Sequence, residues 1–356
     1  MHVPDGFLDV PTSVATGVVA VGAVGLALRK AAPEIKESGP ALPGLVAAFV
    51  FATQMVNFPV GAGTSGHLMG GALAAALVGP WTAVLVMTVV LLIQAVLFAD
   101  GGLTALGTNV SVLGAVTVLA GYLVMAALLR VLPKTRGAVV AASSIGALVS
   151  VPVAARVFTG LYAVGGTVDI PTGRVAAAMV GWHTLIGIGE ALITGAVVSA
   201  VLTTRPDLVY VARHLRRDLQ LVDAQGNSRT VAADEVGARP ATRVGRTPVL
   251  AFLAASLVVA GAMSYFASAN PDGLEFVAEK FGFTSQDHAL VNSPTADYGI
   301  AGVDNAFLSG GLAGILGVLV TVLVGAGIAW VVRRGARRDD DRSSADRHDD
   351  APVGGR

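Results

Sequence analysis

The first two residues of the chain, Met1 and His2, form a dipeptide that can chelate a metal ion. The free terminal amine and the His2 amide nitrogen close a five-membered ring on the ion, and the amide with the imidazole Nδ1 closes a six-membered ring. Three nitrogens then lie in one plane, so a single further imidazole completes a square. Planar nitrogen coordination suits Ni(II) or Cu(II) and, with more distortion, Co(II). We predict that His67 supplies the fourth nitrogen.

Three of the six histidines, His2, His67 and His183, fall near the predicted outer ends of apolar segments, on one side of a membrane. Polar side chains at such positions are costly unless they have partners or a function. For His67, which follows Ser65 and Gly66, the structural alternative to ligation is a hydrogen-bonded place at the start of a helix. The chelating dipeptide makes us favour ligation.

We expect further polar residues to support the ligands without binding the ion, and the candidates are Asn57, Ser65, Asp100, His183 and Glu190. His183 and Glu190 are seven residues apart, so they share one face of a helix. Glu190 lies deep in an apolar segment, where an unpaired carboxylate is costly. It either pairs with a buried donor such as His183 or Arg174, or it orients a metal ligand.

A second chemistry competes with metal binding, because Gly63-Thr64-Ser65-Gly66 matches the GxSG pattern of intramembrane serine proteases of the rhomboid type. In those enzymes a histidine on another span activates the serine, and His183 could do so here. The tryptophan-arginine loop and the HxxxN helix usual in those enzymes are absent from the sequence. We therefore keep the protease as a minor alternative.

Two absences from the sequence limit the remaining functions. The chain has no cysteine, which excludes disulfides, thiolate metal sites and cysteine nucleophiles. It also has no Walker A sequence, so if ATP drives transport, another subunit must hydrolyse it.

The composition indicates what must position these residues. Of the 356 residues, 54% are hydrophobic and 13% charged, and the mean hydropathy is +0.70. Such a composition, with apolar runs near twenty residues, predicts an all-α polytopic membrane protein. We predict about nine spans, at roughly 10–28, 42–56, 67–79, 81–98, 107–129, 138–159, 175–203, 248–268 and 306–332. The third is short and flanked by glycines, so we expect it to be tilted or partly re-entrant, with 57–66 lining a cavity.

The same pattern predicts two modules. Residues 1–203 form a seven-span core, and residues 248–332 form two spans around an extracytoplasmic loop. The polar segment 204–247 is a cytoplasmic linker, and we expect the charged tail 333–356 to be disordered. In the loop, Asp272 and Glu275 have the spacing of a capping box, which explains them at least as well as metal binding does.

Basic residues set the predicted orientation. With the amino terminus outside, 21 of the 24 lysines and arginines lie on the cytoplasmic side, as the positive-inside rule requires. No basic segment precedes the first apolar run, so we expect it to be a span and not a cleaved leader. The bulky His2 favours retention of Met1. We predict a multi-pass protein of the bacterial cytoplasmic membrane.

Four segments in order, 1–8, 63–71, 98–109 and 187–194, resemble the CbiM/NikM family. They read MHVPDGFL, GTSGHLMGG, FADGGLTALGTN and GIGEALIT. Members of this family are the substrate-binding membrane components of energy-coupling-factor transporters for cobalt and nickel. The second module carries Pro271-Asp272-Gly273-Leu274-Glu275 and resembles the small CbiN/NikN-like partner, of the PDGLE type, fused to the same chain.

The resemblance implies a site and partners. The transported ion is Co2+ or Ni2+, and its ligands carry over onto the amine of Met1, the amide and imidazole of His2, and His67. The implied partners are a CbiQ-type transmembrane coupling protein and a CbiO-type ATP-binding-cassette ATPase, besides membrane lipid. The chain itself is then neither an enzyme nor a nucleic-acid-binding protein, and it needs no organic cofactor. The sequence is also compatible with a membrane metal sensor that does not transport and with a channel-like carrier that acts alone.

Overall fold

The computed structural model describes residues 1–215, 219–222, 228–231, 246–287, 290 and 293–349, and it confirms a helical membrane protein. Seven of its helices are long and apolar enough to cross a membrane. They cover Val10–Lys30, Pro80–Phe98, Leu106–Val131, Arg136–Gly165, Thr172–Thr204, Thr247–Phe266 and Ala306–Ala336. Each coincides with one of the predicted spans.

The other two predicted spans are short helices inside the bundle, α3 (Ala41–Gln54) and α4 (Gly71–Val78). At 1.5 Å per residue, eight residues of α4 extend only about 12 Å, well short of a bilayer core of about 30 Å. Every residue of α4 is buried. Gly70 and Gly79 end the helix on both sides with φ of 83° and 90°, a conformation that favours glycine. The short third segment predicted from its glycines is therefore a buried half-helix.

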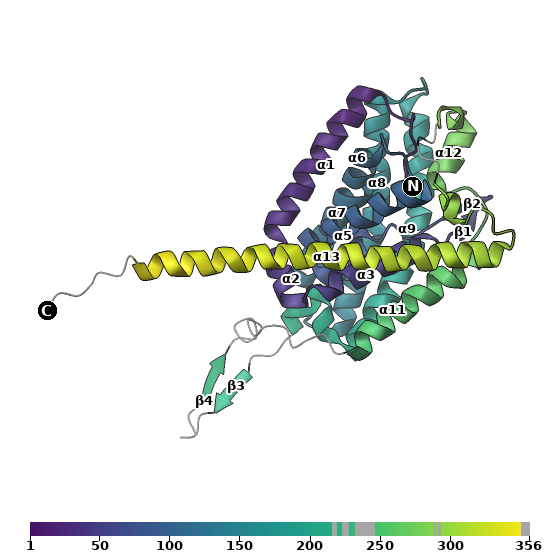
Figure 1. Ribbon diagram of the computed structural model, residues 1–356. Coiled ribbons are helices and arrows are strands. Elements are labelled where there is room, and N and C mark those ends of the chain that lie inside the picture. The colour runs from purple at the N-terminus through teal and green to yellow at the C-terminus, as the bar shows by residue number, and fades with distance from the viewer. Residues whose placement is uncertain (216–218, 223–227, 232–245, 288–289, 291–292, 350–356) are drawn as a thin grey trace.

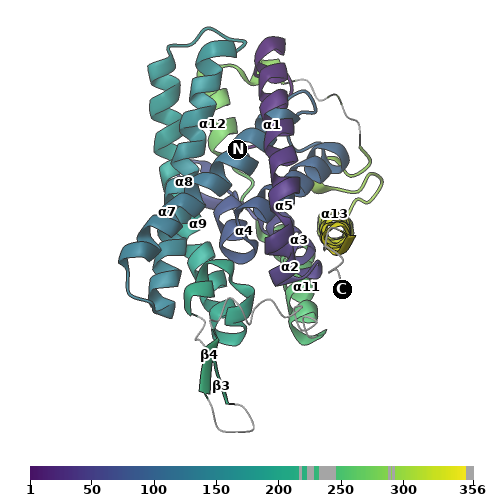
Figure 2. The ribbon, with the colours of Figure 1, turned by 90° about the vertical axis from the view of Figure 1, so that its left-hand side faces the viewer.

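Long helices surround α4 on the remaining sides (Figures 1 and 2). They are α1 (Val10–Lys30), α5 (Pro80–Ile93), α7 (Thr117–Val131), α8 (Arg136–Gly165) and α9 (Thr172–Thr204). The helices approach closely where residues are small, as helices in lipid commonly do. A Cβ on Gly121 of α7, for example, would lie 2.6 Å from the Cβ of Ala72 in α4.

Two stretches of π-helix interrupt the regular helices near the polar loop at 99–105. The segment η1 (Gln94–Phe98) ends α5, and η2 (Val110–Val116) joins the short α6 (Leu106–Asn109) to α7. Stretches of π-helix are frequent at functional sites, because they shift which side chains face inward. Here they flank the loop that carries Asp100, and Ala99 turns the chain there with a φ of 53°.

The fused module packs on the core through α3. Its helices are α11 (Arg246–Gly261), α12 (Gly273–Phe281) and α13 (Ala306–Asp349), with the 3-10 turns η5 (Met263–Phe266), η6 (Thr284–Gln286) and η7 (Ala296–Tyr298). Helices α11 and α13 both contact α3, and α12 contacts α9. Helix α13 runs across the direction of α1 and α8, since Figure 2 views it end-on.

The predicted linker is described only in part. It begins with η3 (Pro206–Leu208) and η4 (Tyr210–Leu215); Val209 between them and Val211 in η4 are buried against the core. A hairpin of β3 (Leu219–Val222) and β4 (Ser228–Val231) follows, and residues 232–245 lie outside the described part of the chain.

The structure differs from the prediction at the carboxyl-terminal tail. We expected disorder from residue 333 onward, but α13 continues to Asp349. No proline interrupts this stretch before Pro352. Residues 350–356 lie outside the described part.

Candidate metal centre

The amino terminus is buried inside the bundle, and the loop at 99–109 holds it there. Met1 and Val3 are 2% and 0% exposed. The Val3 N–H donates to Asn109 Oδ1 at 2.8 Å, and Asn109 Nδ2 donates to the Val3 carbonyl at 3.0 Å. Asp5 Oδ1 accepts the N–H of Thr104 at 2.7 Å. These contacts thread the first residues inward and fix where the amine lies.

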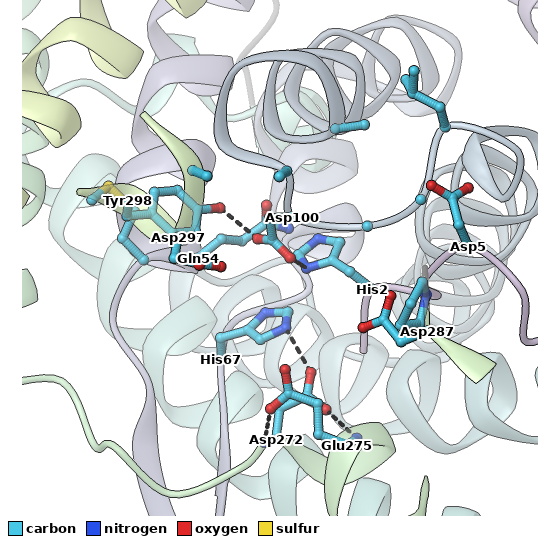
Figure 3. A pocket seen from close by; sticks show the side chains of 18 of the residues that line it. His2, Asp5, Gln54, His67, Asp100, Asp272, Glu275, Asp287, Asp297 and Tyr298 are labelled. Atoms are coloured by element: carbon cyan, nitrogen blue, oxygen red, sulfur yellow. Dashed lines mark hydrogen bonds and ion pairs between the residues drawn. The ribbon is translucent and has the colours of Figure 1, made fainter. Parts of the chain in front are cut away.

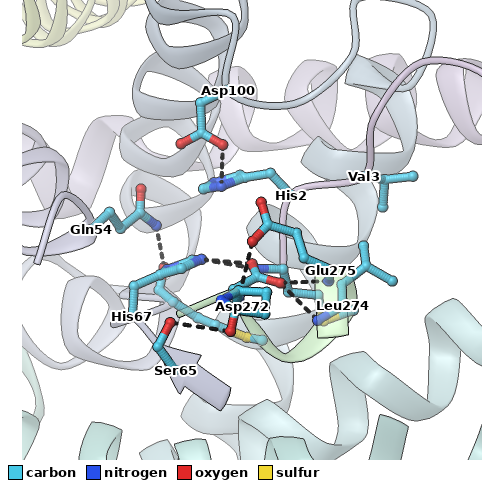
Figure 4. A network of polar contacts seen from close by, with 12 residues as sticks. His2, Val3, Gln54, Ser65, His67, Asp100, Asp272, Leu274 and Glu275 are labelled. Atoms are coloured by element: carbon cyan, nitrogen blue, oxygen red, sulfur yellow. Dashed lines mark hydrogen bonds and ion pairs between the residues drawn. The ribbon is translucent and has the colours of Figure 1, made fainter. Parts of the chain in front are cut away.

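The structure brings the three predicted ligands together. The Met1 amine nitrogen lies 2.7 Å from His67 Nε2, and the rings of His2 and His67 stack with centroids 5.0 Å apart (Figure 4). Nδ1 of His67 lies 3.0 Å from the Leu68 carbonyl, which leaves Nε2 to face the amine. His67 Nε2 thus faces the Met1 amine, and its ligation of a metal ion stays a prediction.

Glu190 on α9 fixes the chain just after His67. Its carboxylate accepts the N–H of Met69 at 2.5 Å and the N–H of Gly70 at 2.9 Å. The carboxylate is thus satisfied by backbone, and its partner is neither His183 nor Arg174. Because both bonds lie within three residues of His67, Glu190 orients the His67 segment through the main chain.

His183 lies beside the fused module instead. Its Nδ1 is 2.7 Å from the Met179 carbonyl, and its Nε2 is buried with no hydrogen-bond partner among the described residues. A Cβ on Gly273 would come within 2.9 Å of the His183 ring, so only a glycine fits there without displacement.

Asp100 binds the second residue of the chelating dipeptide. Its Oδ1 lies 2.8 Å from His2 Nδ1, and its Oδ2 accepts the hydroxyl of Tyr298 at 2.5 Å. Burial favours the neutral carboxyl, but the His2 imidazole and the two hydrogen bonds outweigh it and lower the pKa of Asp100 to about 2. The carboxylate is therefore charged and holds the His2 ring away from the amine.

Asp272 binds the first residue of the dipeptide. The Met1 amine donates to its Oδ2, which also lies 3.6 Å from His67 Nε2. Its Oδ1 accepts the N–H groups of Leu274 and Glu275 at 2.7 and 2.9 Å, and the Glu275 carboxylate accepts the N–H of Asp272, so the predicted capping box is confirmed. Burial opposes ionisation, but the Met1 ammonium and His67 hold the pKa of Asp272 well below its ordinary value.

A cavity of about 850 Å³ opens beside His2 and His67 (Figure 3). Asn57, one of the predicted supporting residues, lines it. Both modules supply its walls, including six carboxylates: Asp5, Asp100, Asp272, Glu275, Asp287 and Asp297. A chamber with this many carboxylates attracts cations.

Ser65 connects the two modules. It lies in β2 (Thr64–Gly66), which pairs with β1 (Phe58–Gly61), and its Oγ donates to the Asn270 carbonyl at 2.7 Å while its N–H donates to Pro271. Ser65 Oγ donates to Asn270, and His183 Nε2 has no hydrogen-bond partner among the described residues, so the hydrogen bond between nucleophile and base that a serine protease needs is not formed. The carboxylates that line the cavity, by contrast, suit a cation.

Among the described residues, no three His, Asp or Glu side chains group closely enough to hold a metal ion. The Met1 amine and the His2 amide are nitrogens outside the side chains that could complete such a set. Metal–nitrogen distances of about 2.0 Å place neighbouring corners of a square about 2.8 Å apart. The distance of 2.7 Å between the amine and His67 Nε2 matches one such edge.

Sequence reasoning missed the roles of Asp272, Tyr298 and Asn109. Asp272 was recognised only as a helix cap, since its contact with Met1 spans 271 positions. Asn109 belongs to one of the four resembling segments, which was its only signal. Tyr298 had none.

Comparison with known proteins identifies the family. Residues 2–208 match the family model CbiM, described as the cobalt uptake substrate-specific transmembrane region, and residues 246–334 match the PDGLE domain. A putative fused nickel transport protein NikMN of Archaeoglobus fulgidus is 38% identical over 211 residues, 59% of this chain and 68% of that protein. A cobalt transport protein CbiM of Geobacter sulfurreducens is 30% identical over 326 residues, 87% of this chain and 88% of that one.

A solved structure supports the same assignment. The crystal structure of a transition metal transporter superposes with a TM-score of 0.51 at 30% identity and covers 57% of this chain and 93% of its own. The 57% of this chain that superposes is about as long as the predicted core, residues 1–203. The chain therefore belongs to the CbiM/NikM family of membrane proteins for cobalt and nickel transport, with a PDGLE domain fused to its carboxyl-terminal side.

Proposed function

We propose that this chain is the substrate-binding component of an energy-coupling-factor transporter and that it binds Co2+ or Ni2+ through four nitrogens. These are the Met1 amine, the His2 amide, His2 Nδ1 and His67 Nε2. The observation that carries the proposal is the approach of the buried amine to His67 Nε2, at 2.7 Å, inside a chamber lined by carboxylates. The names of the relatives, which specify cobalt and nickel, are consistent with it.

One rotation completes the square. His2 Nδ1 faces Asp100 in this arrangement, and it must turn toward the amine to bind the same ion. Asp100 then remains close enough to stabilise the positive charge of the ion. The ligands must be a neutral imidazole, a free amine and a deprotonated amide, so metal affinity should fall in acid.

The sequence has no Walker A motif, so uptake that is driven by ATP needs another subunit to hydrolyse it. We propose that a CbiQ-type membrane protein and a CbiO-type ATPase supply the energy, in the bacterial cytoplasmic membrane, with the amino terminus extracytoplasmic. The carboxylate chamber then faces the side from which the ion arrives.

The proposal is tested by blocking the amine. Two residues, Gly-Ser, added before Met1 should abolish binding, because an amide nitrogen replaces the amine and no longer fits the buried pocket. The same dipeptide added after Arg356 is the control, and it should leave binding unchanged. Binding is measured by metal analysis and by the visible absorption of the Ni(II) or Co(II) complex. Unchanged affinity in the amino-terminally extended protein would overturn the site.

A further inference from the structure

We infer that Asp272 of the fused module is a placeholder for the metal: it holds the Met1 amine in the metal-free protein and is displaced when the ion binds. The inference rests on the proposed function, because it assumes that the amine is a ligand. It adds a role for the PDGLE helix, which would report whether the site is loaded.

The Met1 amine is the group for which Asp272 and the metal ion would compete. The amine donates to Asp272 Oδ2 and lies against His67 Nε2, and Met1 is only 2% exposed (Figure 4). As an ammonium that donates to Asp272, the terminal nitrogen has no free lone pair, so an ion can bind it only after it gives up a proton. A metal at the corner between the amine and His67 would occupy the space beside Oδ2, which is 3.6 Å from His67 Nε2. Ion and carboxylate therefore compete for one nitrogen.

The position of Asp272 in its helix is the second feature that supports the inference. Asp272 is the N-cap of α12, and its Oδ1 accepts the N–H groups of Leu274 and Glu275 in the first turn. The same carboxylate thus ties the start of α12 to the amino terminus of the chain. If the ion takes the amine, the ionic contact between Asp272 and Met1 is lost, and the first turn of α12 loosens.

The fused module also holds the other arm of the chelate, through Asp100. Tyr298 donates to Asp100 Oδ2, whose other oxygen binds His2 Nδ1. Tyr298 adopts a φ of 56°, which is rare for a residue other than glycine and marks a place where surrounding contacts impose the conformation. The fused module thus contacts the amine directly, through Asp272, and the imidazole indirectly, through the hydrogen bond of Tyr298 to Asp100 of the core.

A pair of matched substitutions tests the competition. Asp272→Asn keeps the helix cap, because asparagine caps as well as aspartate, and it removes the charge that holds the amine. Glu275→Gln removes an equal charge from the same chamber and the same helix and keeps the capping box, but it does not touch the amine. We expect Asp272→Asn to bind Ni(II) about tenfold more tightly or better. Loss of a hydrogen bond to a charged group changes an equilibrium constant by about this factor.

The control decides the interpretation. Glu275→Gln should bind Ni(II) with parental or slightly lower affinity, since it only weakens the attraction of the chamber for cations. If Asp272→Asn binds more weakly than Glu275→Gln, Asp272 assists binding and the inference is wrong. Equal changes in both variants would assign the effect to charge alone and would also overturn it.

Hydrogen exchange tests the movement in the unmodified chain. Loading with Ni(II) should slow exchange of the amides in 1–7, which the ion orders, and accelerate exchange at Leu274 and Glu275, which lose the fixed Asp272. Slower exchange in both segments would contradict displacement. Failure of the proposed function has a different signature: the protein would bind Ni(II) equally well with Gly-Ser before Met1, or would not bind it at all.

Discussion

A single carboxylate on α9 decides how accurately the imidazole of His67 is placed. Glu190 is fully buried, yet no ion pair joins it to a cation within the described part of the chain, and two backbone N–H groups satisfy it. Residues that orient a metal ligand in this way typically change metal affinity by about 10- to 100-fold when they are replaced. Glu190 should therefore matter for binding although it does not touch the ion.

We predict that Glu190→Gln weakens metal binding and lowers stability. The glutamine side chain offers one oxygen and one NH2 group, so either the Met69 or the Gly70 N–H would face a donor in a buried place. An unsatisfied buried group costs about 1–3 kcal/mol. Thermal unfolding and Ni(II) titration measure both effects. Glu279→Gln, at an exposed position of α12, is the control, and parental behaviour of both variants would refute the prediction.

At this scale the sequence predicts Met1 and His2 as ligands because chelation depends on adjacency and on residue type, which are visible in one dimension. His67 is predicted from its place near the outer end of an apolar segment. Sequence reasoning misjudged the partner of Glu190, because backbone N–H groups carry no sequence signal. The second contact of Asp272 was invisible for a similar reason: helix capping is local, whereas the contact with Met1 joins two modules.

At the scale of elements, glycine sets how closely the two modules approach. A Cβ on Gly44 of α3 would lie 2.7 Å from the backbone nitrogen of Ala326 in α13, and a Cβ on the neighbouring Gly325 would lie 3.0 Å from the Cα of Gly44. Such contact between backbones is a common way for helices to associate in lipid. Since α12 and η7 belong to the same module as α13, this packing also determines where Asp272 and Tyr298 lie.

We predict that Gly44→Ala separates α13 from α3 and lowers the free energy of unfolding by about 1–3 kcal/mol, as overpacking usually does. Gly22→Ala on α1 is the matched control, because a Cβ there meets no atom within 4 Å. It should be neutral or stabilising by about 0.5–1 kcal/mol. Thermal unfolding in detergent compares the two. An equal melting temperature for both variants would show that the modules do not need this contact.

Apolar runs predicted where helices occur, but not how long they are. The runs that form α3 and α4 are apolar throughout, yet Gly70 and Gly79 end α4 after eight residues. Hydropathy measures what lipid or protein interior tolerates, and it does not distinguish a lipid-facing span from a half-helix enclosed by other helices. The helical continuation of α13 beyond residue 333 was missed because composition alone favoured disorder.

At the scale of the whole molecule, one chamber is built by two modules that lie far apart in sequence. Asp5 and Asp100 come from the core, whereas Asp272 and Asp297 come from the fused module (Figure 3). Because the two modules are joined in one chain, they are present in equal number, and each is at a high effective concentration near the other. The chamber serves uptake only if it faces outward, which makes orientation the decisive property.

We predict that the amino-terminal side is extracytoplasmic and that α13 spans the membrane. The chain has no cysteine, so single cysteines can be labelled without background. Cysteines at exposed positions 173 and 304 should react with an impermeant maleimide on intact cells, whereas those at exposed positions 134 and 335 should react only after permeabilisation.

The positions on α13 are the sharper test, because this helix runs across the direction of α1 and α8 (Figures 1 and 2). The stretch Ala306–Ala336 is long and apolar enough to cross a bilayer, and Arg333 and Arg334 lie at its carboxyl-terminal end, where cytoplasmic basic residues are expected. Charged residues near the end of a span can extend to the interface, but the sequence adds further charges at 337–342, and these need water. Labelling of 304 and 335 from the same side would mean that α13 lies along the membrane and that the two-span arrangement of the fused module is wrong.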